Sequence, residues 1–366
     1  MQSFVDYGSL IGAVTLIDKK GILIQTDAVG EYKQDTIFQI QSMSKPFVSV
    51  AIMILVERGK IPSVDSKVSD LSGFQDFPYR DITVKQLLTH TSGMWSVKEG
   101  KDGMFYGVVP YYLNRLDTAP EVSVRDKSLE FVARHFANPK LYPLGSNDYA
   151  YSNVGYITLG WIIEKLGGEP FEQFLKKNII DKLEMKDTFI FPSKASTEQR
   201  SRIANVDRRP PDVLDIGDYD KTRPGWRYPS PEAGLYSTAK DLRQFLSIFR
   251  HKGKTPGYSH ILNEGSIKQL IEDQVPKVNF GCDGQIGRGL GFDVTRQGGC
   301  FSMPGLDAGS IFHGGRYHTF FWYNPVKDEI GVFLLQKITR RDEKTSYSYR
   351  GERQAFMQLV ERIKTN

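Results

Sequence analysis

Residues 37–56 read Ile-Phe-Gln-Ile-Gln-Ser-Met-Ser-Lys-Pro-Phe-Val-Ser-Val-Ala-Ile-Met-Ile-Leu-Val. The first four residues favour a strand. The apolar run from Pro46 to Val56 predicts a helix that is hydrophobic on all its faces, which is typical of a buried helix. Pro46 suits the first turn of this helix, and Gly59 follows its end. The polar segment Ser42-Met43-Ser44-Lys45 is therefore expected at an interior junction between a strand and a buried helix.

Ser42 and Lys45 have the spacing of a nucleophile and its base. Positions i and i+3 share one face of a helix, so the Lys45 amine can reach the Ser42 hydroxyl. Burial lowers the pKa of a lysine, and a neutral amine can accept the serine proton. The helix N-terminus also favours an oxyanion formed at Ser42. A second Ser-x-x-Lys stands at 237–240; we assign it to helix capping, because Thr238 and Asp241 have capping-box spacing.

Tyr151-Ser152-Asn153 precedes a helix expected from Val154 to Leu166. Taken alone, the tripeptide is best explained by packing of Tyr151 and by Asn153 as a helix cap. In a site, a tyrosine hydroxyl beside a lysine can shuttle a proton. An asparagine amide can bind a substrate carbonyl and hold the lysine in place.

His313-Gly314-Gly315 precedes an aromatic strand pattern. Two glycines allow a substrate backbone to approach the edge of a sheet closely. The backbone N–H of Arg316 is a candidate to pair with that of Ser42 as an oxyanion hole. Considered by itself, the segment is equally well explained as a glycine turn with an incidental histidine.

Strand patterns lie at both ends of the chain, with helical patterns between them. The predicted strands are 12–17, 22–25, 290–294, 319–323 and 330–335. Further helices are predicted from 83 to 89 and after Pro170, and residues 203–232 form a long loop. A closing amphipathic helix carries the apolar stripe Phe356, Leu359, Val360 and Ile363.

The simplest packing of these elements is an α+β fold. One antiparallel sheet pairs the N-terminal hairpin with the C-terminal strands; the closing helix covers one face, and an inserted helical region covers the other. We place an α/β sandwich domain in residues 1–41 and 225–366 and a helix-rich inserted domain in 42–224. The active site is expected at their interface.

Composition narrows the possible functions. The 366 residues carry a net charge of +5, and the densest basic run, 340–344, is offset by its own acidic residues, which argues against a nucleic-acid partner. No apolar stretch is long enough to cross a bilayer, and no secretory signal is visible. Cys282 and Cys300 form one disulfide if the protein is exported, or otherwise two free thiols. The six histidines lack metal spacing, no dinucleotide or P-loop pattern occurs, and Gly-x-Ser-x-Gly is absent.

Together, the three segments resemble the serine β-lactamase and penicillin-binding protein superfamily, in particular its class C-like branch, which also holds D,D-peptidases, D-amino-acid amidases and carboxylesterases. Flanking segments at 87–93, 143–156, 233–239 and 312–315 are similar to family signatures. The resemblance runs from about residue 10 to the C-terminus in the family's order. It implies a β-lactamase/transpeptidase-like fold and export, with the leader absent from this chain.

The resemblance also implies roles for residues. Ser42 is the nucleophile, Lys45 its partner and Tyr151 the proton shuttle; the substrate-binding residues are Asn153, His313, Gly314, Gly315 and Arg316. His313 stands where lactamases usually carry the Lys of Lys-Thr-Gly, and an imidazole is mostly neutral at pH 7, which argues against efficient β-lactam turnover.

The implied function is that of a serine hydrolase that forms an acyl-enzyme with small esters, amides, D-peptides or β-lactams and needs no metal or cofactor. The alternative is a penicillin-recognising sensor or peptide-binding module that is acylated without turnover.

Overall fold

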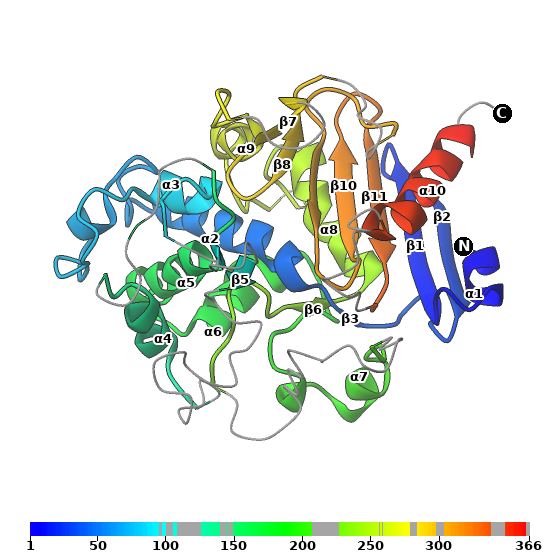
Figure 1. Cartoon of the computed structure of the whole chain (residues 1–366), viewed down its shortest axis with the longest axis horizontal. Coiled ribbons are helices and arrows are strands. Elements are labelled where there is room, and N and C mark those ends of the chain that lie inside the picture. Colours follow the sequence, from blue (N-terminus) through cyan, green and yellow to red (C-terminus); the bar gives the residue numbers. More distant parts are fainter. Residues whose placement is uncertain are drawn as a thin grey trace.

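The computed structural model describes residues 1–94, 97–99, 105–107, 126–139, 144, 149–206, 227–255, 257, 259–278, 284–297, 304–337 and 348–363. Its main feature is a seven-stranded antiparallel sheet with the order β2-β1-β11-β10-β9-β8-β7 (Figure 1). The strands are β1 Gly12–Lys19, β2 Ile22–Gly30, β7 Ile286–Arg288, β8 Asp293–Thr295, β9 Ile311–Gly314, β10 Phe320–Asn324 and β11 Glu329–Leu334.

The pairing of β1 with β11 joins the two ends of the chain, with Val14 opposite Leu334, and confirms the predicted antiparallel sheet. The predicted strand at 290–294 is correct only at Asp293 and Val294, which belong to β8. Residues 289–292 form a turn in which Gly291 has φ +86° and the Gly289 N–H donates to the Phe292 carbonyl. The strands β7 and β8 lie on either side of this turn, because a left-handed glycine ends the extended backbone.

Helix α10 (Ser348–Ile363) covers one face of the sheet, as predicted. Phe356 stacks on Phe333 with ring centroids 5.3 Å apart, and Val360 is buried beside it. Leu359 was expected in the same apolar stripe, but it is 44% exposed. The stripe is therefore narrower than the sequence pattern indicated.

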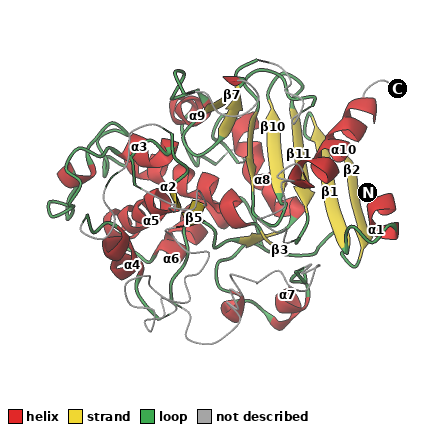
Figure 2. Ribbon diagram, viewed as in Figure 1, coloured by secondary structure: helices red, strands yellow, loops and turns green. Residues whose placement is uncertain are grey.

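The opposite face is covered by α8 (Ala239–Arg250), which contacts β1, β10 and β11 (Figure 2). The prediction that the inserted helical region covers this face directly is therefore wrong. Thr238 caps α8 by accepting the Asp241 N–H at 3.2 Å, as its spacing predicted. Phe245 of α8 stacks on Phe47 at a centroid distance of 3.8 Å, so α8 joins the sheet to the helical region.

Helix α2 (Lys45–Glu57) is the centre of the helical region, and its residues from Lys45 to Leu55 are all buried, as its sequence predicted. It packs against α5 (Asn153–Gly167). The cap of α5 is Ser152, whose side chain accepts the Gly155 N–H at 3.0 Å; the assignment of this cap to Asn153 is wrong. The N-terminus of α2 thus lies where the helical region meets the sheet layer (Figure 1).

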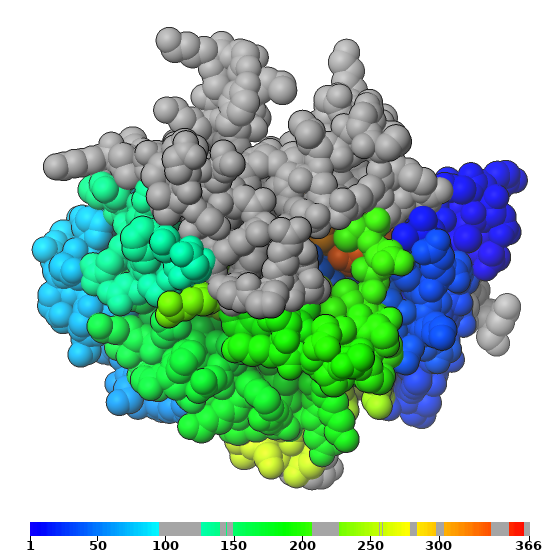
Figure 3. All heavy atoms as spheres, turned by 90° about the horizontal axis from the view of Figure 1, so that it is seen from below, coloured from blue at the N-terminus to red at the C-terminus, as the bar shows by residue number. Residues whose placement is uncertain are grey.

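The remaining elements complete the helical region and its connections. They are α1 Gln2–Asp6, β3 Phe38–Gln39, α3 Val84–Thr89, β4 Val97–Glu99, β5 Phe105–Gly107, α4 Leu129–Phe136, α6 Phe171–Leu175, α7 Thr197–Ser201, β6 Tyr236–Ser237 and α9 Glu264–Ile271. In Figure 3, the green surface at the centre belongs to the part of the chain that holds α6 and α7, and the blue N-terminal segment lies beside it. None of the described helices has the length and hydropathy that a bilayer span requires.

Some predictions fall on residues that the structure does not describe. Cys282, Cys300 and the run 340–344 lie outside the described ranges, as does most of the long loop at 203–232. The domain boundaries proposed from the sequence stay a prediction.

Candidate active site

Ser42 and Lys45 lie at the start of the buried helix. Ser42 belongs to a 3₁₀ turn, Gln41–Ser44, that runs into α2, and Gln41 enters this turn with φ +52°. The Lys45 Nζ atom lies 3.1 Å from Ser42 Oγ, within hydrogen-bond distance. Lys45 is fully buried and Ser42 is 7% exposed. The i, i+3 spacing in the sequence therefore produces the expected pair.

The Lys45 amine is held in an environment that favours its neutral form. The pKa of Lys45 is lowered to about 7: burial lowers it most, the Glu232 carboxylate raises it, and the Arg288 charge lowers it. The Nζ atom also donates to the Glu232 carbonyl oxygen at 2.9 Å and lies 4.8 Å from the centroid of the Tyr151 ring. At neutral pH a large fraction of Lys45 is therefore available to accept a proton.

Glu232 is a site residue that the sequence analysis missed. Its buried carboxylate accepts hydrogen bonds from the Tyr228 hydroxyl at 3.0 Å and the Ser230 hydroxyl at 2.8 Å. Gly234 follows in a place without room for a side chain, since a Cβ there would lie 2.1 Å from the Pro229 carbonyl oxygen. Glu232 is 187 residues from Lys45, and no local pattern marks it as a partner.

His90 is a second residue whose importance the sequence analysis missed. It follows α3 in a left-handed conformation with φ +61°. It is also fully buried, its Nδ1 accepts the Ser152 N–H at 3.0 Å, and its ring centroid lies 4.5 Å from that of Tyr151. Burial lowers the pKa of His90 well below 6.5, so the neutral ring carries its proton on Nε2. His90 thereby fixes the segment that presents Tyr151.

His313 lies on β9 and is 3% exposed. Its Nδ1 atom lies 2.8 Å from the Gly314 carbonyl oxygen, which can only accept, so Nδ1 carries the proton and Nε2 presents a lone pair. Burial and the charges of Arg288 and Lys45 lower the pKa of His313 well below its usual value. His313 is therefore a neutral hydrogen-bond acceptor, and it does not replace an ammonium.

The end of β9 is packed against the chain just before Ser42. A Cβ on Gly315 would lie 2.1 Å from Thr319 Oγ1 and 2.4 Å from the Ile40 carbonyl oxygen, and Thr319 Oγ1 donates to that same carbonyl at 3.1 Å. Glycine is thus required at 315 by the protein's own backbone, which is a different reason from the substrate approach that the sequence suggested. This contact fixes β9 relative to the 3₁₀ turn of Ser42.

The structure brings Ser42, Lys45 and Tyr151 together directly, and β9, which carries His313, ends against the backbone just before Ser42, where Gly315 meets the Ile40 carbonyl oxygen. Asn153 is buried at the first turn of α5, two residues from Tyr151, and Arg316 is partly exposed after β9. Over the described part of the chain, no group of three or more His, Cys, Asp or Glu side chains could hold a metal ion.

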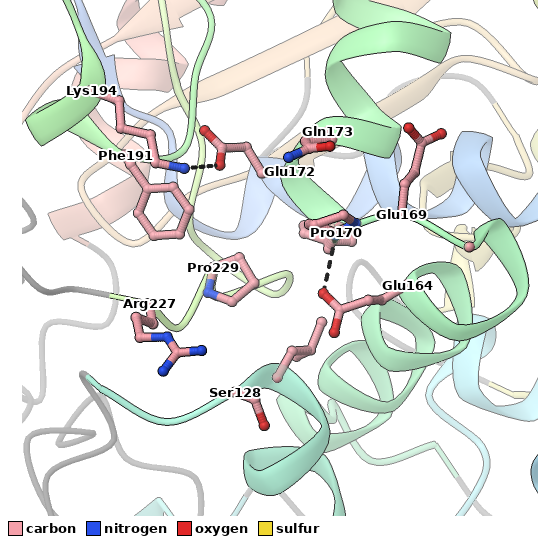
Figure 4. A pocket seen from close by; sticks show the side chains of 13 residues that line it. Ser128, Glu164, Glu169, Pro170, Glu172, Gln173, Phe191, Lys194, Arg227 and Pro229 are labelled. Carbon is pink, nitrogen blue, oxygen red and sulfur yellow. Dashed lines mark hydrogen bonds and ion pairs between the residues drawn. The ribbon is translucent and has the colours of Figure 1, made fainter.

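A separate hollow of about 570 Å³ lies beside α6 and is lined by residues of α4, α5 and the 227–229 segment (Figure 4). Its charged groups are already satisfied in part: Glu164 accepts the Phe171 N–H at 3.1 Å, and Lys194 donates to Glu172 at 2.5 Å. None of the predicted site residues lines it. We therefore assign the candidate active site to the Ser42 junction and not to this hollow.

Comparison with known proteins defines the class. The chain belongs to the Beta-lactamase family, whose family model matches residues 1–354. The chain is 25% identical to Esterase EstB of Burkholderia gladioli, in an alignment that covers 85% of this chain and 82% of the esterase.

Solved structures share the fold. EstCE1, described as a hydrolase with promiscuous acyltransferase activity, matches with a TM-score of 0.73 at 21% identity, over 97% of this chain and 96% of its own. The D-amino acid amidase of Ochrobactrum anthropi matches with a TM-score of 0.67 at 19% identity, over 98% of each chain. The α+β fold is thus that of β-lactamase-like proteins, and the relatives named here are hydrolases.

Proposed function

We propose that the protein is a serine hydrolase that transfers the acyl group of a small ester or amide to Ser42 Oγ and then to water. The observation that carries this proposal is the contact of 3.1 Å between Ser42 Oγ and a fully buried amine whose pKa is about 7. A neutral Lys45 accepts the serine proton as Oγ attacks the carbonyl carbon. This step needs no other base.

Tyr151 is proposed to donate its hydroxyl proton to the leaving group and to take up the proton that Lys45 received from Ser42, because its ring lies against the Lys45 amine. The leaving alcohol or amine then departs and leaves an ester on Ser42, which water hydrolyses. We propose the backbone N–H groups of Ser42 and Arg316 as the oxyanion hole, and the Asn153 amide and the β9 residues His313 and Gly314 as contacts of the substrate.

The proposed substrates are esters and amides, and the neutral state of His313 gives an acid group on a substrate no ammonium to bind at this position. A β-lactam carries a carboxylate that a fixed ammonium would bind, and His313 at this position is uncharged and presents an acceptor. The relatives named an esterase and a D-amino acid amidase agree with this choice of substrates.

The test compares hydrolysis of short-chain nitrophenyl esters, D-alanyl peptides and a chromogenic cephalosporin. Ser42→Ala should lower kcat/KM for the best substrate by at least about a thousandfold. Ser237→Ala is the matched control, since Ser237 begins the second Ser-x-x-Lys of the chain, and it should keep its activity. Full activity in Ser42→Ala would refute the proposal.

Intact mass measured after addition of an activated ester or a penicillin separates hydrolysis from sensing. Rapid product release with a transient adduct on Ser42 supports the hydrolase. A lasting adduct without turnover would instead support the alternative of a sensor that is acylated and stays acylated.

A further inference from the structure

Arg288 is a buried cation with three of its five N–H donors unused among the residues described. It is the last residue of β7 and is 1% exposed. Its Nη1 donates to Asp293, its register partner on β8, whereas its Nε and Nη2 atoms have no hydrogen-bond partner among the residues described. Nε and Nη2 form the side edge of a guanidinium, whose two parallel N–H bonds match the two oxygens of a carboxylate.

The position of Arg288 connects it to the catalytic centre. The turn that follows it packs on α2, because a Cβ on Gly291 would lie 2.0 Å from Ser49 Oγ, one helical turn beyond Lys45. The Arg288 Cζ atom lies 5.9 Å from the centroid of the Tyr149 ring. Its charge lowers the pKa of Lys45, His90 and His313 alike. Arg288 is therefore connected to the proposed base through ring contacts that run from Tyr149 to His90, from His90 to Tyr151 and from Tyr151 to Lys45.

The edge of β9 gives a path from the nucleophile to Arg288. The β8–β9 ladder ends where Asp293 pairs with Phe312, and from His313 onward no described strand pairs with that side of β9. A substrate lying along β9 next to His313 would therefore meet the start of β8, where Asp293 holds Arg288.

The energetics of burial also require a partner. A buried charge is costly unless its hydrogen bonds are satisfied, and Asp293 satisfies only one nitrogen of Arg288. The neighbouring imidazoles of His90 and His313 do not supply an anion, because a histidine ring is either neutral or cationic. A small acidic group bound to Nε and Nη2 would satisfy the remaining hydrogen bonds of Arg288.

We propose that Arg288 binds a carboxylate of the substrate, so that the enzyme prefers esters or amides that carry an acid group near the scissile bond. This inference rests on the proposed function of Ser42 and names the substrate class for that site. Arg288, and not His313 or Arg316, supplies the fixed positive charge.

The experiment uses two matched pairs of esters. In the first, mono-4-nitrophenyl glutarate is compared with 4-nitrophenyl 5-methylhexanoate, which replaces the carboxylate by an isopropyl group. In the second, the butyrate ester of 3-hydroxybenzoate is compared with that of its methyl ester, so that the acid lies in the leaving group. The wild type should prefer the acid in one pair by at least about tenfold in kcat/KM, mainly through KM, as for one charged hydrogen-bonded contact.

Arg288→Met should reduce this preference, taken as the ratio of kcat/KM for the acidic and the neutral ester, to below about twofold. Because removal of Arg288 leaves Asp293 unpaired, Arg288→Met/Asp293→Asn is tested in parallel, and Asp293→Asn alone should keep the preference for the acid. In the wild type, glutarate should inhibit hydrolysis of the neutral ester at lower concentration than glutaramide.

Two results would overturn this inference: no preference for the acid in either pair, or a preference that survives in both Arg288→Met variants. An equal loss of activity on the acidic and the neutral ester would show a purely structural role for Arg288, and would also overturn it. Failure of the proposed function is distinct, because it would appear as hydrolysis of the neutral ester that does not depend on Ser42.

Discussion

The Lys45 amine should set the acidic limb of the pH profile. The fall of the pKa of Lys45 from 10.5 to about 7 corresponds to about 5 kcal/mol in favour of the neutral amine. About half of the enzyme then has a neutral Lys45 at pH 7, compared with about one molecule in 3,000 for an unperturbed lysine. Below pH 7 the amine is protonated and cannot accept the Ser42 proton, so kcat/KM should fall about tenfold per pH unit.

Glu232→Gln tests whether the nearby charges set the pKa of Lys45. The carboxylate raises the pKa of Lys45, so its removal should lower the pKa and move the limb to lower pH. A unit charge within about 10 Å at an effective dielectric of about 20 contributes at least about 1.5 kcal/mol, which corresponds to a shift of about one pH unit. The backbone carbonyl that binds Nζ is kept, and a glutamine oxygen can still accept from Tyr228 or Ser230.

The assay is kcat/KM for a neutral nitrophenyl ester between pH 5 and 10. Glu264→Gln is the control, because Glu264 is exposed on α9 and pairs with Lys252, and its limb should not move. A limb in Glu232→Gln that stays in place or moves upward would refute the electrostatic argument. A wild-type midpoint near 10 would show that Lys45 is charged at neutral pH and is not the base.

Gly234→Ala should lower kcat/KM at least about tenfold and the free energy of unfolding by about 1–3 kcal/mol, because its Cβ would displace Pro229 and the segment that positions Glu232. Gly257→Ala is the control, because a Cβ at Gly257 would lie 3.8 Å from its nearest neighbour, Thr255 Oγ1. Equal effects of the two substitutions on the free energy of unfolding in urea would contradict this reasoning. Burial lowers the pKa of His318 to about 3. The free energy of unfolding should therefore fall as the pH drops below 6.5, because only the unfolded chain then binds the proton. His318→Asn, which tolerates the φ of +63°, should remove about 2 kcal/mol of the stability lost between pH 7 and pH 5, and an unchanged loss would be contrary evidence.

The parts of the site that the sequence predicts correctly are those that depend on local geometry. Ser42 and Lys45 are three residues apart on one helix start, and the helix is buried because every face is apolar. The predicted cap of α5 was wrong by one residue, since Ser and Asn are both good caps and only the extended backbone of Ser152 decides between them.

The parts of the site that could not be predicted from the sequence depend on contacts between residues that are far apart in the chain. Glu232 reaches Lys45 across 187 residues, and Arg288 acts on the pKa of Lys45 from the edge strand of the sheet. Neither stands in a motif, because a carboxylate or a guanidinium affects a pKa through space at any sequence separation. The turn at Gly291, which was predicted as a strand from its apolar neighbours, is also what packs the β7–β8 connection onto α2.

The opposing effects of Glu232 and Arg288 on Lys45 link substrate binding to the strength of the base. The charge of Arg288 lowers the pKa of Lys45, and a carboxylate bound to Arg288 would offset that charge. The pKa of Lys45 should then be higher in the enzyme–substrate complex than in the free enzyme. Because kcat reports the complex and kcat/KM the free enzyme, an acidic ester should give a kcat limb at higher pH than its kcat/KM limb.

A neutral ester should show no such separation of the two limbs, since it leaves the charge of Arg288 in place. Arg288→Met should bring the two limbs of the acidic ester together, because the bound acid then has no cation to offset. Coincident limbs for the acidic ester in the wild type would mean that the bound acid does not reach Arg288. The separation of the two limbs thus shows, from pH profiles alone, whether a carboxylate bound to Arg288 changes the pKa of Lys45.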